Sequence, residues 1–345
     1  MTATDPEAVA LAAVDGSVTA RGSGRRYRVI RNANAGSKGA IPTNACTPEQ
    51  LCELLAERDL GDDIVETATE DEARTAARQA VADGIDVVVA AGGDGTIGLV
   101  ADELIGSRSA LGILPLGSVM NIPRMLGLPR ELAPAADILA TGTTAVIDVG
   151  EARGRPFYEA GSVGMNAAIF REANRFDDGD WLSIVKTIWV ALRYRPARMR
   201  LELDDGRIVR TRALMVAVAN GPYTGAGMTV APDALLDDGR FEVRVFRGFS
   251  KWELVRHLAA IAFGRYQYAP HVSTYRSAWV RVSSRHPLPA RADGTDLGVT
   301  PIEFAIRPGA LRVVVAGPDA AQAVAGPVEL GFRSPHPEPT RRPTT

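Results

Sequence analysis

Between Asp86 and Thr96 the chain reads DVVVAAGGDGT, in which a short apolar run stops at glycines, an aspartate and a threonine. The pattern predicts a strand that ends at Ala91, a glycine turn, and a helix from Ile97 to about Ile105. This arrangement points free backbone N–H groups and the positive end of a helix at a phosphate. The glycines allow a ligand to approach the backbone closely because they lack a Cβ atom.

Asp94 stands among these glycines. A carboxylate beside a phosphate is repelled unless a cation or a hydroxyl lies between them. The position of Asp94 therefore indicates metal-assisted phosphoryl chemistry.

The same segment has competing interpretations. Residues 93–98 also fit G-x-G-x-x-G, the fingerprint of dinucleotide-binding turns. That fingerprint expects an acidic residue at the end of the next strand, whereas the predicted strand at 111–116 is followed by Gly117 and Ser118. A tight turn that binds no ligand is the other alternative.

The chain has 345 residues, a hydrophobic content of 46% and a formal net charge of -2. This length favours two domains, and the charge gives no sign of a nucleic-acid footprint. We expect no secretory leader and no transmembrane segment, because the apolar stretches are shorter than the roughly 20 residues that a span needs. Cys46 and Cys52 lack the neighbours of a zinc site, so we expect neither a disulfide nor a zinc cluster.

Strand and helix signals alternate over residues 25–146, which predicts an α/β domain with a doubly wound parallel sheet. Thr47, Pro48 and Gln50 are typical of a helix start with a capping box, and the alanines from 73 to 80 predict a second helix that stops at Gly84. The predicted strands cover residues 27–31, 64–67, 87–91 and 111–116.

Ligands of such sheets bind outside the carboxyl ends of the strands. We therefore expect the loops that follow these strands to form one site, and they contain Asn32, Thr67, Gly92 to Thr96, and Gly117 with Ser118.

Residues 147–317 predict a second, mostly antiparallel β domain. Polar and apolar residues alternate at 199–204 and 241–246, while 213–219 and 311–316 are denser apolar runs that we assign to the same antiparallel strands. Residues 1–24 are predicted to be a flexible tail, and residues 318–345 a C-terminal segment with a flexible, proline-rich end.

Residues 181–194 place apolar side chains at helical spacing. They form either a helix that packs on the sheet or an apolar wall for a lipid or a membrane surface. The arginines that follow, Arg193, Arg195, Arg198 and Arg200, are either a contact for anionic headgroups or ordinary solvated charges.

An ordered set of motifs runs from residue 32 to residue 294. Its members are the glycine loop at 92–96, NANAG at 32–36, PLGS at 115–118 with Asn121 and Arg124, the glycine-rich segment 220–227, APDALLDDG at 231–239, and Asp293-Gly294. This set resembles the motifs of the diacylglycerol kinase catalytic superfamily, the bacterial lipid kinases and sphingosine kinases, which are distantly similar to NAD kinases.

The resemblance implies an α/β nucleotide domain and a β-rich acceptor domain, with the active site in the cleft between them. It further implies that ATP lies around residues 93–99, Thr67 and Ser118. A structural magnesium would be held by the Asp238 carboxylate and the backbone carbonyls of Leu235 and Arg240. Read from the residues alone, Asp237 to Gly239 are typical of a hairpin turn. The nucleotide-binding residues that we expect are Asn32, Thr67, Gly92, Gly93, Asp94, Gly95, Thr96, Gly117 and Ser118.

Phosphoryl transfer to an alcohol needs cradled phosphates, Mg²⁺ and a carboxylate near the acceptor hydroxyl. Asp94 is the candidate for orienting Mg²⁺. Asp293 resembles the proton acceptor of the family, a general base, and the alternative is a loop carboxylate before a glycine turn.

The chain departs from the family pattern at several positions. Gly98 and Leu99 replace an Asn-Glu pair, two residues (Val119 and Met120) stand where one is commoner, and Pro123 falls in an opening helix, which tolerates it only in its first turn. Thr295 replaces the glutamate of D-G-E.

These observations leave three alternative functions. The chain is an ATP-dependent kinase of a lipid alcohol (diacylglycerol or a sphingoid base), a kinase of a soluble acceptor like the NAD kinases, or a catalytically silent nucleotide- or lipid-binding module. For a lipid kinase, the expected partners are ATP, Mg²⁺ and a lipid at a membrane surface. We expect no nucleic-acid partner. We expect a cytoplasmic protein, peripheral at the inner membrane surface, and the sequence is compatible with a homodimer.

Overall fold

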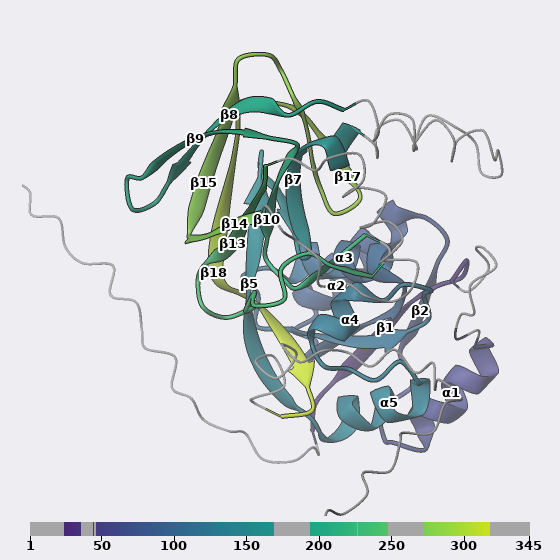
Figure 1. Cartoon of the computed structure of the whole chain (residues 1–345). Coiled ribbons are helices and arrows are strands. Elements are labelled where there is room, and N and C mark those ends of the chain that lie inside the picture. The colour runs from purple at the N-terminus through teal and green to yellow at the C-terminus, as the bar shows by residue number, and fades with distance from the viewer. Residues whose placement is uncertain are drawn as a thin grey trace, which may run out of the picture. The chain divides into compact units, whose positions relative to one another are not determined.

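The computed structural model describes residues 24–35, 44, 46–168, 194–225, 227–247 and 272–317 (Figure 1). The chain divides into two compact units. Among the described residues, the first unit contains those up to Asp148 and those from Gly309 onward, and the second contains Val149–Pro308. The predicted tails, apart from Gly24, and the predicted helix at 181–194, apart from Tyr194, lie outside the described residues.

The first unit alternates strands and helices as its sequence predicts. In chain order its elements are β1 (Tyr27–Asn32), α1 (Pro48–Ala56), β2 (Ile64–Thr67), α2 (Glu70–Ala82), β3 (Val87–Gly92), α3 (Asp94–Leu104), β4 (Ala110–Pro115), α4 (Asn121–Met125), α5 (Leu132–Thr141) and the start of β5 (Thr143–Ala152).

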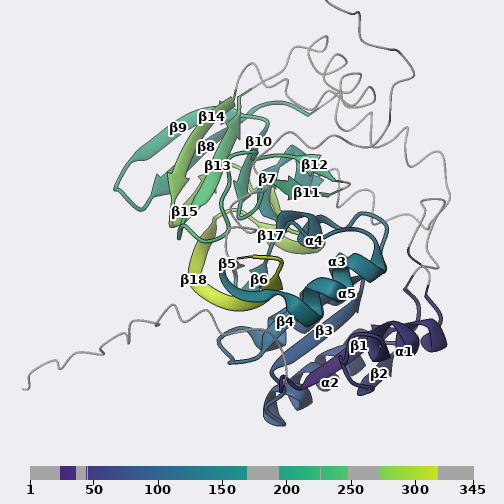
Figure 2. The ribbon, with the colours of Figure 1, turned by 90° about the horizontal axis from the view of Figure 1, so that it is seen from below.

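A parallel sheet in the order β2-β1-β3-β4 forms the centre of this unit, and Figure 2 shows these strands in a row. Their ends are in register: Asn32 pairs with Thr67, and Gly92 pairs with Pro115. The carboxyl ends of the strands therefore lie at one edge, which confirms the predicted convergence of the four loops in this unit.

Both faces of the sheet are buried, and every residue of β3 is buried. Val87, Val89 and Ala91 belong to a core with α1 and α5. The residues that alternate with them face the other side, where α2 contacts β1 and α3 contacts β3. A strand buried on both faces must be apolar throughout, and this accounts for the continuous run VVVAA.

The starts of two helices show what the sequence encodes locally. The predicted capping box of α1 is present, because Thr47 Oγ1 accepts the Gln50 N–H (3.3 Å) while Gln50 Oε1 accepts the Thr47 N–H (3.0 Å). Helix α3, predicted from Ile97, instead begins at Asp94 directly after an extended Gly93. Glycine is a poor helix former, so Gly95 concealed the first turn.

The second unit is a β-sandwich. Its elements are β6 (Arg155–Phe157), β7 (Ala160–Gly164), β8 (Ala197–Leu203), β9 (Ile208–Ala213), β10 (Met215–Ala219), β11 (Tyr223–Thr224), β12 (Met228–Thr229), β13 (Phe241–Phe246), β14 (Val272–Ser277), β15 (Trp279–Ser284), β16 (Pro289–Ala292), β17 (Thr295–Val299) and β18 (Ile302–Val315).

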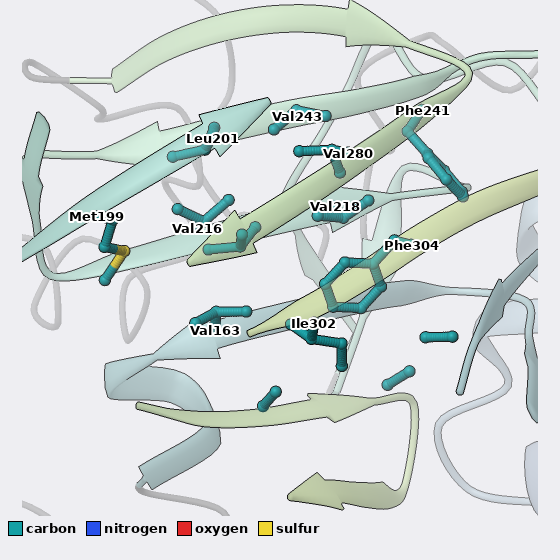
Figure 3. Packing of buried hydrophobic residues seen from close by; sticks show 14 of the residues in the cluster. Val163, Met199, Leu201, Val216, Val218, Phe241, Val243, Val280, Ile302 and Phe304 are labelled. Atoms are coloured by element: carbon teal, nitrogen blue, oxygen red, sulfur yellow. The ribbon is translucent and has the colours of Figure 1, made fainter. Parts of the chain in front are cut away.

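One sheet of the sandwich has the order β14-β13-β10-β7-β16-β17, and the other places the start of β18 next to β15, β8 and β9. Buried side chains of both sheets form one core, in which Leu201 and Val280 meet Val218, Val243 and others (Figure 3). The strand pairs within the two sheets of this unit are antiparallel, for example β15 with β8 and β10 with β13, as predicted.

Two apolar runs differ from the prediction. The run at 213–219 is divided, because β9 ends at Ala213 and β10 begins at Met215. The run at 311–316 is the end of β18, which returns to the first unit and pairs in parallel with β4 through Arg312 and Val313. The apolar residues of this run follow one another closely because the end of β18 is buried in a parallel sheet and not in the antiparallel domain.

No helix in the described ranges is both long and apolar enough to cross a membrane.

Candidate active site

The glycine loop after β3 is closed by a side chain of its own helix. A Cβ atom at Gly92 would lie 2.5 Å from the Thr96 Cβ, so only glycine fits there. Thr96 is 6% exposed, and its Oγ1 accepts a hydrogen bond from Asn32 Nδ2 at 3.0 Å. The end of β1 is thereby tied to the first turn of α3.

A second glycine loop lies against the first. A Cβ atom at Gly117 would lie 2.6 Å from the Gly93 Cα and 2.8 Å from the Met120 Sδ. The two backbones therefore touch at Gly93 and Gly117. Gly95 differs from both, because a Cβ atom there would meet nothing within 4 Å.

Helix α3 has no side-chain cap at its N-terminus, where Gly93 is the N-cap residue. The first N–H groups of a helix have no partner within the helix and carry the positive end of its dipole. At α3 these groups belong to Asp94, Gly95 and Thr96, beside a loop whose glycines permit close approach. This end of the sheet is therefore suited to bind phosphate.

The other expected residues of this edge also lie in the first unit. Thr67 is buried and donates through Oγ1 to the Arg31 carbonyl at 3.2 Å, while its own carbonyl accepts the Ala33 N–H at 2.9 Å. Ser118 follows Gly117, and its carbonyl accepts a hydrogen bond from Arg130 Nη2 at 2.8 Å.

Two residues that support the second glycine loop could not be predicted from the sequence. Arg130 holds the Ser118 carbonyl, and Asn44 Nδ2 donates to the Pro115 carbonyl at 2.9 Å and to the Arg130 carbonyl. Both residues lie outside the glycine motifs, and no pattern in the sequence indicated that they meet there.

Asp94 does not project freely into this site. Its Oδ2 accepts the Asn121 N–H and its Oδ1 accepts the Ile122 N–H, both at 2.9 Å, so it caps the N-terminus of α4. Burial raises the pKa of the Asp94 carboxyl, and these N–H groups together with that of Met120 oppose the rise. Each carboxylate oxygen can still accept a further bond, so the predicted role in orienting Mg²⁺ stays a prediction.

The extra residue before α4 has a local consequence. Met120 has φ 62°, in the left-handed region, and is the N-cap residue of α4. Pro123 lies in the first turn of this helix, at the third position from its start, where its missing N–H costs no helical hydrogen bond. The departures at these positions thus leave the α4 start able to bind Asp94.

Asp293 forms the turn between β16 and β17 in the second unit. Its Oδ2 accepts the Tyr158 N–H at 2.7 Å, and its Oδ1 accepts the N–H groups of Glu159 and Ala160, each at 3.1 Å. Its φ is 44°, a backbone conformation that costs a non-glycine residue about 1–3 kcal/mol. Such strain persists only where the surroundings enforce it, and it is commonest at functional sites.

The electrostatics of Asp293 suit a general base. Burial raises its pKa to about 6, against the opposing effects of the three N–H groups and of Arg291. Burial also lowers the pKa of Arg291, while Asp293 and Glu159 act to raise it. A carboxyl with a pKa near 6 is ionised at neutral pH yet is a stronger base than an exposed aspartate.

The segment Tyr158–Ala160 joins two of the sequence motifs, and sequence reasoning missed it. Its N–H groups bind Asp293, and the Glu159 carbonyl accepts the N–H groups of Asn220 and Gly221 at 3.0 Å. The buried Glu159 side chain also accepts the Gly225 N–H at 3.1 Å. The glycine-rich segment and Asp293 are thus bound to the same short stretch of chain.

The expected magnesium loop lies elsewhere in the second unit. Asp238 Oδ1 accepts the Arg240 N–H at 3.0 Å, which is a turn closed by the side chain and not the hairpin turn that the residues alone suggested. The buried Oδ2 lies against the guanidinium of Arg276. The residues fit a cation, because a buried carboxylate oxygen demands positive charge, but Mg²⁺ would have to displace Arg276.

Within the described ranges, no three or more His, Cys, Asp or Glu side chains are grouped to hold a metal. A site built from one carboxylate and the carbonyls of Leu235 and Arg240 would not form such a group. Asp238 and Asp293 bind different partners and belong to separate clusters of the second unit.

Comparison with known proteins assigns both units. Residues 26–152 match the diacylglycerol kinase catalytic domain, and residues 160–315 match the YegS C-terminal NAD kinase beta sandwich-like domain. A protein described as "Probable lipid kinase YegS-like" from Chromohalobacter salexigens is 31% identical over 243 residues, which cover 68% of this chain and 78% of that protein. The chain belongs to the YegS-like lipid kinase family.

Other similar proteins agree with this family. A diacylglycerol kinase from Bacillus subtilis is 27% identical over 239 residues, 68% of this chain and 78% of that protein. The crystal structure of a diacylglycerol kinase from Bacillus anthracis superposes with a TM-score of 0.65 at 18% identity, over 84% of this chain and 97% of that one. The YegS-like fold, an α/β nucleotide domain and an antiparallel β domain, is therefore confirmed.

Proposed function

We propose that this member of the YegS-like lipid kinase family transfers the γ-phosphate of ATP to the hydroxyl of a lipid alcohol, of the diacylglycerol or sphingoid-base type. The observation that carries the proposal is the uncapped N-terminus of α3 beside two touching glycine loops. This feature supports phosphate binding by the first unit, and family membership supports a lipid kinase.

In this proposal the N–H groups at the start of α3 bind the phosphates of ATP. Asn32 fixes Thr96 and so holds the first turn of α3 against the end of β1. Asp94, through its bonds to Asn121 and Ile122, keeps the second glycine loop and α4 against the first. Thr67, Gly117 and Ser118 complete the nucleotide site at the same edge.

Asp293 is the proposed general base. The acceptor oxygen forms a bond to the γ-phosphorus, the bond from that phosphorus to the ADP oxygen breaks, and the hydroxyl proton passes to the Asp293 carboxylate. Its Oδ2 accepts a hydrogen bond from Tyr158 and keeps a lone pair for the proton. Its raised pKa makes it a better acceptor for that proton.

When bound, Mg²⁺ would neutralise the charge that develops on the transferred phosphate. The Asp94 carboxylate, through its remaining lone pairs, is our candidate to orient it. A second, structural Mg²⁺ is proposed at Asp238 with the carbonyls of Leu235 and Arg240. We also propose that the protein works in the cytoplasm and meets its lipid at the inner membrane surface.

Transfer of labelled γ-phosphate into a panel of acceptors tests this function. The purified chain is incubated with labelled Mg·ATP and neutral detergent micelles that contain diacylglycerol, sphingosine or a monoacylglycerol, and in parallel with NAD. We expect label in one lipid class. Label in NAD alone would favour a soluble acceptor, and ATP binding without transfer to any acceptor would favour a silent binding module.

A further inference from the structure

The outer face of the β8–β9–β15 sheet carries a basic hollow. It has a volume of about 530 Å³, within the range of small-molecule sites. Its lining is Arg198, Met199, Arg200, Arg210, Thr211, Arg212, Ser283, Ser284 and Arg285. We call the arginines of this set the arginine groove. The three strands lie side by side in Figures 1 and 2.

Alternation along the strands explains why the arginines gather on one face. In β8, Met199 and Leu201 are buried in the sandwich core, whereas Arg198 and Arg200 between them are exposed. Every second residue of a strand faces the same side. One face of this sheet therefore builds the core, and the other presents the groove.

The strand register sets like charges directly opposite each other. Arg198 pairs with Arg212, and Arg200 pairs with Arg210. Like charges at directly opposite positions destabilise a sheet. Two such pairs in succession therefore lower the stability of this sheet somewhat, and a bound anion would offset that loss.

The chain supplies little compensation. Arg200 lies 3.5 Å from Glu202, but no described carboxylate is within ion-pair distance of Arg198, Arg210, Arg212 or Arg285. Two other acids of this sheet, Glu202 and Glu303, lie opposite Arg281 in the strand register. Beyond the end of β8, Asp205 pairs with Arg207 and Asp204 with Arg240. The groove thus retains an excess of positive charge.

The side chains favour the phosphates of a lipid surface. Guanidinium groups bind phosphate oxygens through paired N–H donors. Ile208, which is 45% exposed, lies two residues before Arg210 on the same side of β9. Trp279 likewise lies on the side of β15 that holds Ser283. An exposed aliphatic residue and a half-buried tryptophan beside arginines are typical of membrane interfaces, and the net charge of -2 argues against nucleic acid.

We propose that the arginine groove docks the protein onto anionic phospholipid headgroups of a bilayer. The inference rests on the proposed function, because it names the surface through which a lipid kinase would reach its acceptor. Vesicle binding itself needs neither nucleotide nor catalysis, so the two proposals fail separately.

Co-sedimentation of the full chain with vesicles tests the groove. The vesicles contain phosphatidylcholine alone or with phosphatidylglycerol, at low salt and without nucleotide. The test variant is Arg198→Gln/Arg212→Gln, and the control is Arg108→Gln/Arg155→Gln, which removes the same charge from exposed sites elsewhere. We expect binding only to the anionic vesicles, about 25-fold weaker in the test variant at about fivefold per arginine, and nearly unchanged in the control.

The test variant should fold at least as well as the wild type, because it removes a like-charge pair. Arg285→Gln, in the turn after β15, provides a second variant outside the strands, with an expected loss of about fivefold. Three results would overturn the proposal. The groove variants could bind the vesicles as well as the wild type, the control could lose as much binding as the test variant, or the wild type could prefer duplex DNA to anionic vesicles. Phosphorylation of lipid in neutral micelles should be the same in all variants, and its absence from the wild type would count against the proposed function alone.

Discussion

Asp293 combines a strained backbone, a half-buried position and three N–H donors on one carboxylate. The sequence indicated the residue through its place before Gly294, but it could not reveal these properties. The three donors belong to Tyr158–Ala160, more than a hundred residues earlier in the chain. Long-range contacts of this kind leave no local pattern in a sequence.

The first prediction concerns the pH dependence of activity. Because the pKa of Asp293 is raised to about 6, kcat/KM should fall tenfold per pH unit below about pH 6 as the carboxylate becomes protonated. A profile of kcat/KM against pH in neutral micelles measures this fall, which is the acid limb of the profile. A rate that stays constant well below pH 6 would contradict the role of Asp293 as a base.

The same shift affects stability with a defined sign. Because the folded state raises the pKa of this carboxyl from 3.8 to about 6, the folded state binds more protons than the unfolded state between these values. The contribution of Asp293 to the free energy of unfolding is therefore fully present below about pH 4 and is lost as the pH rises to about 6.

Glu159 provides the second prediction at this scale. Its carboxylate shares Arg291 with Asp293, so Glu159→Gln leaves more of the Arg291 charge to act on Asp293. The acid limb of the kcat/KM profile should then move to lower pH. Glu303→Gln, at an exposed position of β18, is the matched control and should leave the limb where it is. A limb unchanged in Glu159→Gln would show that the two carboxylates are not coupled.

At the scale of elements, the sequence predicts features that depend on neighbouring residues in the chain, such as helix starts and strand bounds. The capping box at Thr47 is present, and the predicted strands of the first unit lie within two residues of their observed bounds. The sequence could not indicate that Asp94 caps α4 or that Arg130 and Asn44 hold the second glycine loop, because these contacts join different elements.

The third prediction tests the contact between the glycine loops. Gly117→Ala places a Cβ atom 2.6 Å from the Gly93 Cα, so the loops must move apart. We expect a destabilisation of about 1–3 kcal/mol and an ATP affinity at least about tenfold weaker. Thermal unfolding and calorimetric titration with Mg·ATP measure the two effects.

Gly95→Ala is the control for stability. A Cβ atom at Gly95 meets nothing within 4 Å, and alanine favours a helix over glycine by up to about 1 kcal/mol. This variant should unfold at the wild-type temperature or slightly above it. A Gly117→Ala variant as stable as the control would show that the two loops do not need their close contact.

At the scale of the whole molecule, composition and the alternation of elements predicted the order of the two folds, which family membership confirms. The return of β18 to the first unit was not predictable, because a short, mostly apolar run such as residues 311–316 is compatible with either sheet. The sequence singled out only Arg198 and Arg200 of the arginine groove, because Arg210 and Arg212 come from β9 and Arg285 from the turn after β15.

The fourth prediction concerns the stability of the whole chain. A ligand that binds only the folded state stabilises it, by about 2.7 kcal/mol at a hundred times its Kd. Mg·ATP should therefore raise the Tm by several degrees, and the rise should be smaller in Gly117→Ala. Calorimetric scans at increasing ATP concentration measure the shift. An unchanged Tm at saturating ATP would contradict nucleotide binding by the first unit.

Transfer of labelled γ-phosphate from ATP into lipid, measured for the wild type and Asp293→Asn side by side, tests the central claim most directly. Asp296→Asn makes the same chemical change at an exposed position of β17 and serves as the control. We predict label in a lipid alcohol with the wild type and the control, and a loss of about 10²–10⁴-fold in Asp293→Asn with an unchanged affinity for Mg·ATP. Wild-type transfer rates in a folded Asp293→Asn variant would contradict the account.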